Sequence, residues 1–574
     1  DFNLCVKHGI KASNTMNDAG IYSKEIPFFS GTHIFKADNQ VIEKLLEHKS
    51  LLGNGKLQHS FPHSWRSKAP LVYRATSQWF ISMEKKDLRK KALKAIDDTV
   101  FYPKRGKDRI RSMIETRPDW CISRQRIWGV PLPLFVSKKN KEPLKDPEVI
   151  ENIAKIYEKE GADCWFTDDP QKFLGKKYKK EDYIKSNDIV EVWFDSGATH
   201  SYVLEKRKDL KWPASMYLEG SDQHRGWFHS SLLESCGTRG KAPFKSILTH
   251  GFVVDGKGLK MSKSTGNIIA PEDILKKYGA DILRTWVAAS DYAEDLKLDY
   301  SILEQHAESY RKIRNTFRFL LGNLKDKKNN FDINSKEIEK WPELERFILH
   351  QIFILNKKFE KYFKEYNFHK LYKELVNFCS LELSAFYFDI RKDTLYCDDF
   401  SSIKRRACIN LLELILDILL KWFAPILSFT TEEIFQIINH EKNSSIHLQS
   451  FPKIPDNWKN EKLFEKWEKF KTIRKVVNAA IEVKRFNKNI GSSLEADVEI
   501  YLKEDYLELA KDFDLAENFI TSKAVAKKFT QNDNFFKLND VENINVLVKK
   551  AEGKKCPRCW KIFPGPCERC GTNN

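Results

Sequence analysis

The chain has 574 residues, with 98 Lys and Arg against 80 Asp and Glu, and a formal net charge of +18 at pH 7. This length excludes a single hydrophobic core, so we expect about three to five domains. The positive balance suits a protein that neutralises phosphates over a wide surface, although a general lysine bias would give the same charge. The sequence begins at Asp1 with no secretory signal pattern, and we expect this start to be a truncation.

The longest apolar stretch, residues 411–429, contains charged residues at intervals of four. Glu413, Asp417 and Lys421 therefore share one face of a helix, which predicts a buried bundle helix and excludes a membrane span. Of the eleven cysteines, four crowd into the last nineteen residues and seven are scattered. Scattered cysteines in a large chain predict reduced thiols and a cytoplasmic protein.

The first part of the chain, residues 1–104, contains short apolar runs between turns and predicts no complete fold. From residue 105 to 298, apolar strands are followed by helices, which predicts part of a parallel α/β sheet. In one such unit, residues 215–219 form a strand that ends at Gly220, and a helix follows Arg225. Open α/β sheets bind ligands at the carboxyl ends of their strands, and four polar residues lie there: Glu219, Asp222, Gln223 and His224.

A second strand-and-helix unit begins with a strand at residues 247–254 and a turn at Asp255-Gly256. Residues 271–278 then predict a helix, with Pro near its start, acidic residues in its first turn, lysines in its last turn and Gly279 after it. The loop between the turn and this helix carries the sequence KMSKS, residues 260–264. Such a loop can also be a solvated hinge. The strand before it and the helix after it therefore decide whether a functional role is inferred.

Beyond residue 300 the pattern becomes helical. Apolar residues recur at three-and-four spacing, which predicts a helical bundle over residues 344–359, 367–390 and 403–423. Thr430 and Glu433 match a capping box and predict the start of a further helix. A more charged region follows residue 451 and ends in a cysteine cluster.

The cysteine cluster consists of two pairs with two residues between their members, Cys556 and Cys559, then Cys567 and Cys570. Four thiolates at this spacing suit a closed tetrahedral Zn²⁺ site. A redox or disulfide role is the alternative, which a cytoplasmic setting disfavours.

Three further blocks precede KMSKS in the chain: WCISRQR at residues 120–126, WFDSG at 193–197 and YLEGSDQHRGWF at 217–228. In this order, the four blocks resemble the isoleucyl, valyl and leucyl branch of the class I aminoacyl-tRNA synthetases. The amino-acid sequence of the third block is most similar to that of the isoleucyl members. The resemblance covers nearly the whole chain.

This resemblance implies a multidomain α/β plus α protein whose catalytic domain is a partial Rossmann-type fold. The implied domains are the C-terminal part of an editing domain, the second half of the catalytic domain, a helical anticodon-binding domain, a C-terminal tRNA-contacting region and a zinc module, at residues 1–104, 105–298, 299–450, 451–550 and 551–574. Cys556 to Trp560 resembles the terminal zinc module of bacterial isoleucyl enzymes. The seven residues between its cysteine pairs are fewer than that module has.

The implied reaction is attack of an amino-acid carboxylate on the α-phosphorus of ATP, which the enzyme uses with Mg²⁺. The substrate supplies the nucleophile, so the protein contributes positioning and charge stabilisation. Lys260 and Lys263 would be the catalytic residues that stabilise the departing pyrophosphate. The resemblance implies further ATP contacts from His250, Gly251, Met261, Ser262 and Ser264.

For the aminoacyl adenylate, the resemblance implies contacts from Glu219, Gly220, Asp222 and Gln223, with Trp193 and Trp227 as walls of an aliphatic pocket. Such a pocket separates isoleucine from valine by one methylene, worth about 1 to 3 kcal/mol, so a hydrolytic editing site is needed; isoleucyl enzymes are a standard example of this limit. Asp1 falls where the family has an editing aspartate that binds the substrate's amino group. Editing by this chain alone is not expected.

We therefore expect an isoleucine-tRNA ligase whose partners are tRNA-Ile, isoleucine and ATP, with no DNA or membrane. The family's first signature, a His-Ile-Gly-His-like element, is missing, so we predict that the isolated chain is inactive or nearly so. The alternatives are a valyl enzyme, which the terminal cysteines disfavour, and a non-catalytic RNA-binding adaptor. Aromatic and basic residues of the helical region are expected to help bind RNA, for example Phe386, Tyr387, Arg391, Arg405 and Arg406.

Overall fold

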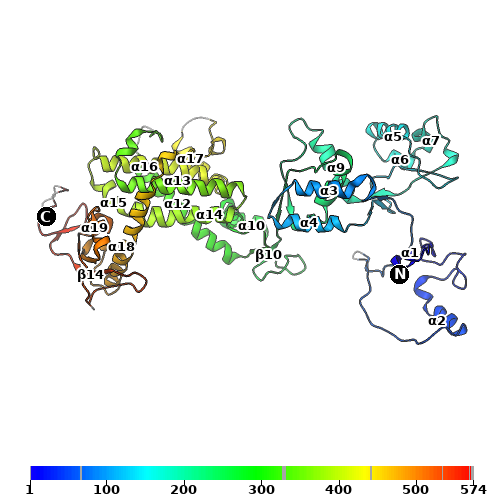
Figure 1. Cartoon of the computed structure of the whole chain (residues 1–574), viewed down its shortest axis with the longest axis horizontal. Helices are drawn as coiled ribbons and strands as arrows, with labels where there is room; N and C mark the ends of the chain where they lie inside the picture. The colour runs from blue at the N-terminus through cyan, green and yellow to red at the C-terminus, as the bar shows by residue number, and fades with distance from the viewer. Residues whose placement is uncertain are drawn as a thin grey trace. The chain divides into compact units, whose positions relative to one another are not determined.

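The computed structural model describes residues 2–64, 67–325, 331–439, 443–532, 534–567 and 569–570. Asp1, the predicted editing residue, lies outside these ranges. The chain forms two units, drawn in Figure 1: unit 1 comprises residues 1–217 and 222–247, and unit 2 comprises residues 218–221 and 248–574. The chain passes between the units within two strands, β8 (Tyr217–Gly220) and β9 (Ser246–His250).

Three helices build the main core of unit 1: α3 (Leu88–Asp97), α4 (Arg105–Glu115) and α9 (Trp227–Arg239). Apolar residues at helical spacing form one buried face on α3 and another on α4, and both faces pack in the same core cluster as α9. A three-stranded sheet of order β2, β9, β8 accompanies these helices, and β2 is Val100–Tyr102.

A smaller core in unit 1 surrounds Trp165, which is fully buried. It is built from α5 (Pro147–Glu160), α6 (Cys164–Thr167), α7 (Pro170–Leu174) and the antiparallel pair β5 (Phe135–Ser137) and β6 (Tyr183–Lys185). Helices α5 and α7 both begin with an aspartate N-cap followed by Pro, the strongest local start signal in this region.

The other elements of unit 1 are short. Helices α1 and α2 precede residue 50, and no residue of α2 is buried, as expected for a segment without a complete fold. Short antiparallel strands pair β1 with β3 and β4 with β7, and a π-helix follows α8. The bounds are α1 Phe2–Lys7, α2 Asp38–Glu47, β1 Phe80–Ile81, β3 Trp120–Cys121, β4 Ser123–Arg124, β7 Ile189–Val190, α8 Val192–Gly197 and the π-helix His200–Leu204.

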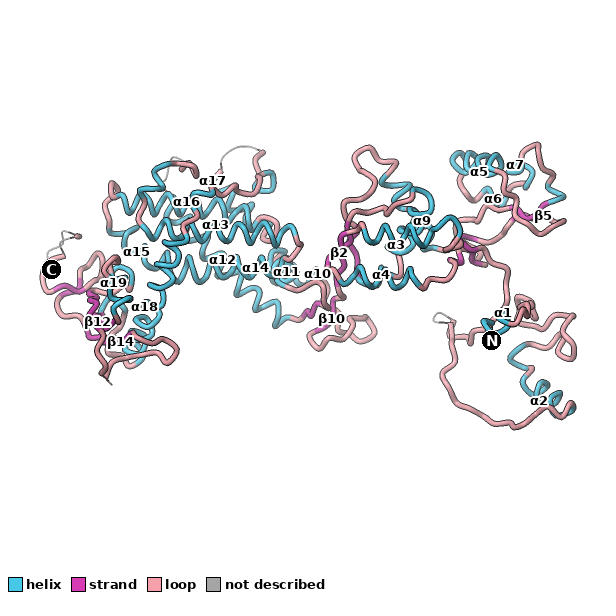
Figure 2. The backbone as a smooth tube through the Cα atoms, in the orientation of Figure 1, coloured by secondary structure: helices cyan, strands magenta, loops and turns pink. Residues whose placement is uncertain are grey.

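Unit 2 is mainly helical over residues 271–438, as Figure 2 shows. Its largest core combines the buried faces of the helices between residues 300 and 438, which confirms the predicted bundle. The elements are α10 Pro271–Tyr278, α11 Ala280–Ala289, α12 Tyr300–Leu324, α13 Glu343–Lys364, α14 Phe368–Asn377, a π-helix at Phe378–Tyr387, α15 Phe388–Cys397, α16 Ile403–Phe423 and α17 Ser428–Ile438. Among the described residues, no helix has the length and apolar character required to cross a membrane.

Two predictions about elements are wrong in their details. Residues 247–254 form two strands, β9 and β10 (Val253–Asp255), because the chain leaves the first sheet at Gly251 and β10 pairs in parallel with β11 (Leu296–Leu298). Thr430 does not cap α17 but lies inside it. The cap comes from α11, where the Asp281 carboxylate accepts hydrogen bonds from the Phe429 and Thr430 N–H groups at 3.2 and 2.7 Å.

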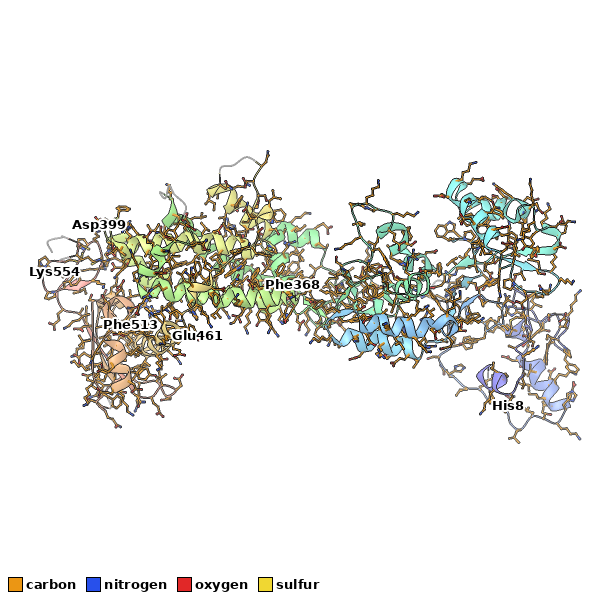
Figure 3. All side chains as sticks on the ribbon, turned by 45° about the horizontal axis from the view of Figure 1, so that its top comes forward. His8, Phe368, Asp399, Glu461, Phe513 and Lys554 are labelled. Carbon is orange, nitrogen blue, oxygen red and sulfur yellow. The ribbon has the colours of Figure 1, made fainter. Side chains whose placement is uncertain are left out.

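The sequence patterns did not predict a sheet in the charged C-terminal region. Helix α18 (Glu461–Phe486) packs on a three-stranded sheet of order β13, β12, β14, in which β13 runs parallel and β14 antiparallel to β12. The sheet faces the same core as the bundle. Phe513, labelled in Figure 3, stacks on Phe470 of α18 with ring centroids 3.9 Å apart. The bounds are β12 Ala496–Leu502, α19 Glu504–Ala510, α20 Leu515–Asn518, β13 Lys523–Lys528 and β14 Ile544–Lys550.

Candidate functional site

Unit 1 brings together four of the predicted adenylate-binding residues, Trp193, Asp222, Gln223 and Trp227. Gln223 lies in a 3₁₀ turn, Ser221–His224, and its Oε1 accepts a hydrogen bond from the Trp227 N–H at 3.0 Å. The Trp227 indole N–H donates to the Ser196 carbonyl at 3.0 Å. On one face, the indole ring stacks on Tyr217 with centroids 4.1 Å apart. These contacts fix the Trp227 side chain at the start of α9.

Gly226 allows this close arrangement. A Cβ atom at this position would lie 2.6 Å from Gln223 Oε1 and 2.9 Å from Trp193 Cη2, so no other residue fits without displacement. The Trp193 side chain nevertheless remains 41% exposed. Asp222 accepts a hydrogen bond from the Gln223 amide at 3.2 Å. An exposed indole and a polar turn thus lie within reach of one another.

The remaining predicted residues belong to unit 2. Glu219 is exposed at the end of β8, and its carboxylate accepts from the Gly220 N–H at 3.2 Å. His250 is half-buried at the end of β9, with Nδ1 2.8 Å from the Gly251 carbonyl oxygen. Gly251 is buried, and an added Cβ would lie 2.2 Å from the Glu294 carbonyl oxygen, so this position requires glycine.

The KMSKS segment follows β10 and a short turn at residues 256–258, and it leads into a second turn at residues 263–266. Lys260 and Lys263 are exposed, and neither forms an ion pair with a residue that the structure describes. Met261 is half-buried against a small core that contains Ile274 and Trp286. Ser262 Oγ lies 3.1 Å from Ser264 Oγ. The segment therefore presents two ammonium groups, unpaired within the described part of the chain, on a turn anchored by its methionine.

A buried acid in unit 1 was not anticipated from the sequence. Glu234 of α9 is largely buried, and its Oε1 has no hydrogen-bond partner among the described residues. Burial is the main cause that raises the pKa of Glu234 to about 9, and the nearby carboxylates of Asp195 and Glu191 raise it further. The residue was missed because its sequence context is that of an ordinary helix. Burial likewise lowers the pKa of His224 to about 4 and that of His229 to about 3.

The terminal cysteines form a cluster that fits a metal ion. Their four ligand atoms lie within 4.8 Å of one another, and Cys559 Sγ lies 3.8 Å from Cys567 Sγ. Thiolates about 2.3 Å from a tetrahedral zinc are separated by roughly 3.8 Å, so the donor set has the required spacing. The surrounding module, with strands β15 (Lys554–Lys555) and β16 (Ile562–Phe563), docks on the end of α15 through ion pairs of Arg569 with Asp393 and Asp398.

The expectation that Phe386, Tyr387 and Arg391 contact RNA is wrong. All three side chains are at most 5% exposed, because they belong to the bundle core. Arg391 is engaged by two carboxylates, as described below. The Arg405 guanidinium stacks on the Phe400 ring at 3.7 Å, and of the residues named for this role only Arg406 has an exposed side chain.

Two known families match successive parts of the chain. The family of class I tRNA synthetases (I, L, M and V) matches residues 5–299, and the anticodon-binding domain of tRNA ligases matches residues 345–500. The chain belongs to the class I tRNA synthetases of this group. Among individual proteins, it is 64% identical over 569 residues to the isoleucine–tRNA ligase of Pelagibacter ubique, which covers 99% of this chain and 62% of the relative.

Other relatives have the same name. The isoleucine–tRNA ligases of Mesorhizobium japonicum and Geobacter sulfurreducens are 46% and 44% identical and match 95% and 100% of this chain. The chain spans 57% and 63% of their lengths, or about three fifths of each relative. Among solved structures, Mycobacterium tuberculosis methionyl-tRNA synthetase in complex with methionyl-adenylate aligns with a TM-score of 0.48 at 15% identity, over 68% of this chain and 69% of that chain.

Proposed function

We propose that the protein to which this chain contributes activates isoleucine with ATP and transfers it to tRNA-Ile. The observation that carries this proposal is the 64% identity to an isoleucine–tRNA ligase across 99% of the chain. The intact KMSKS segment supports a catalytic role over that of a non-catalytic RNA-binding adaptor. The terminal four-cysteine cluster disfavours the valyl alternative.

In this proposal, residues 105–298 form the second half of a Rossmann-type catalytic domain and residues 1–104 form the remnant of an editing domain. Residues 299–450 bind the anticodon stem and loop, residues 451–550 contact tRNA, and residues 551–574 form a zinc module. The match to an anticodon-binding domain over residues 345–500 supports the third assignment. RNA affinity should then fall with increasing salt, because phosphate contacts release counterions.

Lys260 and Lys263 supply the charge stabilisation. Both ammonium groups are exposed and free of ion pairs to described residues, so none of those carboxylates competes with a phosphate for them. In the activation step, the isoleucine carboxylate oxygen attacks the α-phosphorus of Mg²⁺-bound ATP, and the bond to the pyrophosphate oxygen breaks. The two lysines stabilise the negative charge on the departing pyrophosphate. His250, Gly251, Met261, Ser262 and Ser264 form the nucleotide side of this site.

Trp193 and Trp227 bound the aliphatic pocket, while Glu219, Gly220, Asp222 and Gln223 hold the polar part of the adenylate. The Trp227 indole is fixed by its bond to Ser196 and its stack on Tyr217, which makes it a rigid wall. Trp193 retains an exposed face that a branched side chain can cover. A rigid apolar wall binds isoleucine more tightly than valine by the binding free energy of one methylene group, about 1 to 3 kcal/mol.

Cys556, Cys559, Cys567 and Cys570 hold one Zn²⁺ ion. The sulfur spacing supports a closed, four-coordinate site that stabilises the module without taking part in the chemistry. Because Arg569 joins this module to α15, metal binding also stabilises the contact with the bundle.

The proposal is tested by isoleucine-dependent exchange of pyrophosphate into ATP. We expect exchange from a completed protein, in which this chain is extended by the part of its 64% identical relative that it does not match. We expect little or none from residues 1–574 alone. Lys263→Ala should lower kcat by about a hundredfold, the usual cost of losing one charge-stabilising group. The exposed Lys257 outside the motif provides a matched control, and Lys257→Ala should change kcat less than about threefold, since it removes no group from the proposed site. Exchange that depends on valine but not isoleucine would contradict the proposal.

A further inference from the structure

The side chain of Asn267 joins the parts of the KMSKS turn to strand β10. Its Oδ1 accepts hydrogen bonds from the Ser262 N–H at 3.0 Å and from the Thr265 hydroxyl at 2.6 Å. Its Nδ2 donates to Asp255 Oδ2 at 2.9 Å and to the Lys260 carbonyl at 3.3 Å. A carboxamide has two N–H donors and an oxygen with two lone pairs, so these four contacts use its whole capacity.

Asp255 determines which way this amide points. Its Oδ1 accepts from the Leu259 and Lys257 N–H groups at 2.8 and 3.0 Å, which leaves Oδ2 to accept from Asn267. The hydrogen bond from Asn267, followed by that from the Leu259 N–H, lowers the pKa of Asp255. A carboxylate accepts and cannot donate, so it must face the NH₂ group of Asn267 and turn the amide oxygen toward Ser262.

The two lysines are held differently by this arrangement. Lys260 is fixed twice, through its carbonyl bond to Asn267 and through a backbone bridge to Val254 of β10. Lys263 lies at the tip of the turn, between Ser262 and Thr265, which both bond to the same Asn267 oxygen. The hydroxyls of Ser262 and Thr265 are also 2.7 Å apart, which closes the turn. The backbone positions from which the two lysine side chains extend therefore depend on Asn267.

We propose that Asn267, oriented by Asp255, is the positioning residue that sets the separation of Lys260 and Lys263 for the phosphates of ATP. This inference rests on the proposed function and adds to it a residue outside the KMSKS sequence. Asn267 does not reach the substrate; it acts through the backbone of the turn. A turn held by side-chain hydrogen bonds can open for nucleotide entry and reclose in one register.

Three variants separate this role from simple structural support. Asn267→Ala removes all four hydrogen bonds. Asn267→Asp keeps the shape but places a second carboxylate opposite Asp255, where the two charges repel. The exchange variant, Asp255→Asn combined with Asn267→Asp, restores one amide facing one carboxylate, and the new amide at position 255 keeps an oxygen that can accept from the Leu259 N–H. It does not restore the hydrogen bond to the Lys260 carbonyl, because a carboxylate at position 267 cannot donate. An exposed asparagine in unit 1, Asn140, provides the control Asn140→Ala.

The first experiment measures hydrogen exchange by mass spectrometry on peptides that cover residues 255–268 of the present chain. We expect Asn267→Ala and Asn267→Asp to speed amide exchange in this segment about tenfold, because opening of the turn becomes easier, and the exchange variant to restore part of the protection. Unchanged protection in both single variants would overturn the inference, because Asn267 would then not hold the turn.

The second experiment measures isoleucine-dependent pyrophosphate exchange in the completed protein. Small displacements of a positioned group cost up to about a hundredfold in rate, so Asn267→Ala should lower kcat by about 10 to 100-fold with the KM for isoleucine unchanged. Asn267→Asp should be at least as slow, and the exchange variant should be clearly faster than it. Equal kcat in wild type and Asn267→Ala, or no recovery in the exchange variant, would overturn the inference. No exchange by the wild type would instead overturn the proposed function, and the positioning role with it.

Discussion

Removing one partner of the buried ion pair between Glu345 and Arg391 should destabilise unit 2 by several kcal/mol. Arg391 of α15 donates from Nε and Nη2 to the two carboxylate oxygens of Glu345 on α13, at 2.6 and 2.7 Å. Its Nη1 donates to Glu517 of α20 at 2.7 Å, and the Tyr387 hydroxyl donates to Glu345 at 3.1 Å. The side chains of Arg391 and Glu345 are 4% and 0% exposed.

The magnitude follows from this geometry. Breaking a buried pair leaves an uncompensated charge and costs about 3 to 5 kcal/mol, whereas replacing both partners by apolar residues is often nearly neutral. We expect Glu345→Gln to reach the lower half of that range, because Glu517 still neutralises the guanidinium and the Gln oxygen can still accept. The double variant, Glu345→Leu with Arg391→Met, should cost less than Glu345→Leu or Arg391→Met alone, although it leaves the Tyr387 hydroxyl and Glu517 with fewer partners.

The assay is urea unfolding followed by circular dichroism, which compares Glu345→Gln and the four proteins of the double-mutant cycle: wild type, Glu345→Leu, Arg391→Met and the double variant. The control lies on the same helix as Arg391, where the pair Lys392 and Asp389 is 3.1 Å apart at the surface. Lys392→Gln should change the free energy of unfolding by less than about 1 kcal/mol, as surface pairs do. A cost below about 1 kcal/mol for Glu345→Gln, or a double variant less stable than both single variants, would refute the reasoning.

Three further predictions concern the rest of the chain. Because the pKa of Glu234 is raised from 4.5 to about 9, the folded carboxyl stays protonated while the unfolded one ionises, so its contribution to stability is present below pH 4.5 and is lost as the pH rises toward 9. Glu234→Gln should therefore remove a fall in stability on the order of 1 kcal/mol per pH unit within this window. Cys559→Ser should abolish stoichiometric zinc, measured by chelator-detected release. Trp193→Ala should raise the KM for isoleucine in the completed protein at least about tenfold.

Matched variants sharpen these three tests. Glu158 is exposed, and Glu158→Gln should leave the pH dependence of melting as in the wild type. Cys121 lies outside the cluster, so Cys121→Ser should retain zinc. Trp128 is 90% exposed in unit 1, and Trp128→Ala should leave the KM unchanged. A parallel pH dependence in Glu234→Gln, full zinc in Cys559→Ser, or an unchanged KM in Trp193→Ala would each contradict the corresponding assignment.

Local sequence signals determined much of this protein. Helices α10 and α16 begin and end at the predicted residues. The signals that bound a helix, such as proline, acidic residues and glycine, and the apolar periodicity all depend on residues that are close together in the sequence. The cysteine spacing predicted the four-thiol cluster, because short knuckles confine each pair whatever the rest of the fold does. The KMSKS and adenylate-binding residues could be named because contiguous motifs carry the family resemblance.

Contacts between distant segments decided the rest, and no local pattern records them. The N–H groups at the start of α17 are satisfied by Asp281, more than a hundred residues earlier, so the capping box at Thr430 was misleading. Arg391 looks like an RNA contact in sequence and becomes a core residue only when Glu345 and Glu517 surround it. Burial and hydrogen-bond partners depend on which faces meet. The sequence therefore predicts which groups are available, and the tertiary structure decides which of them are buried, paired or left free to bind a substrate.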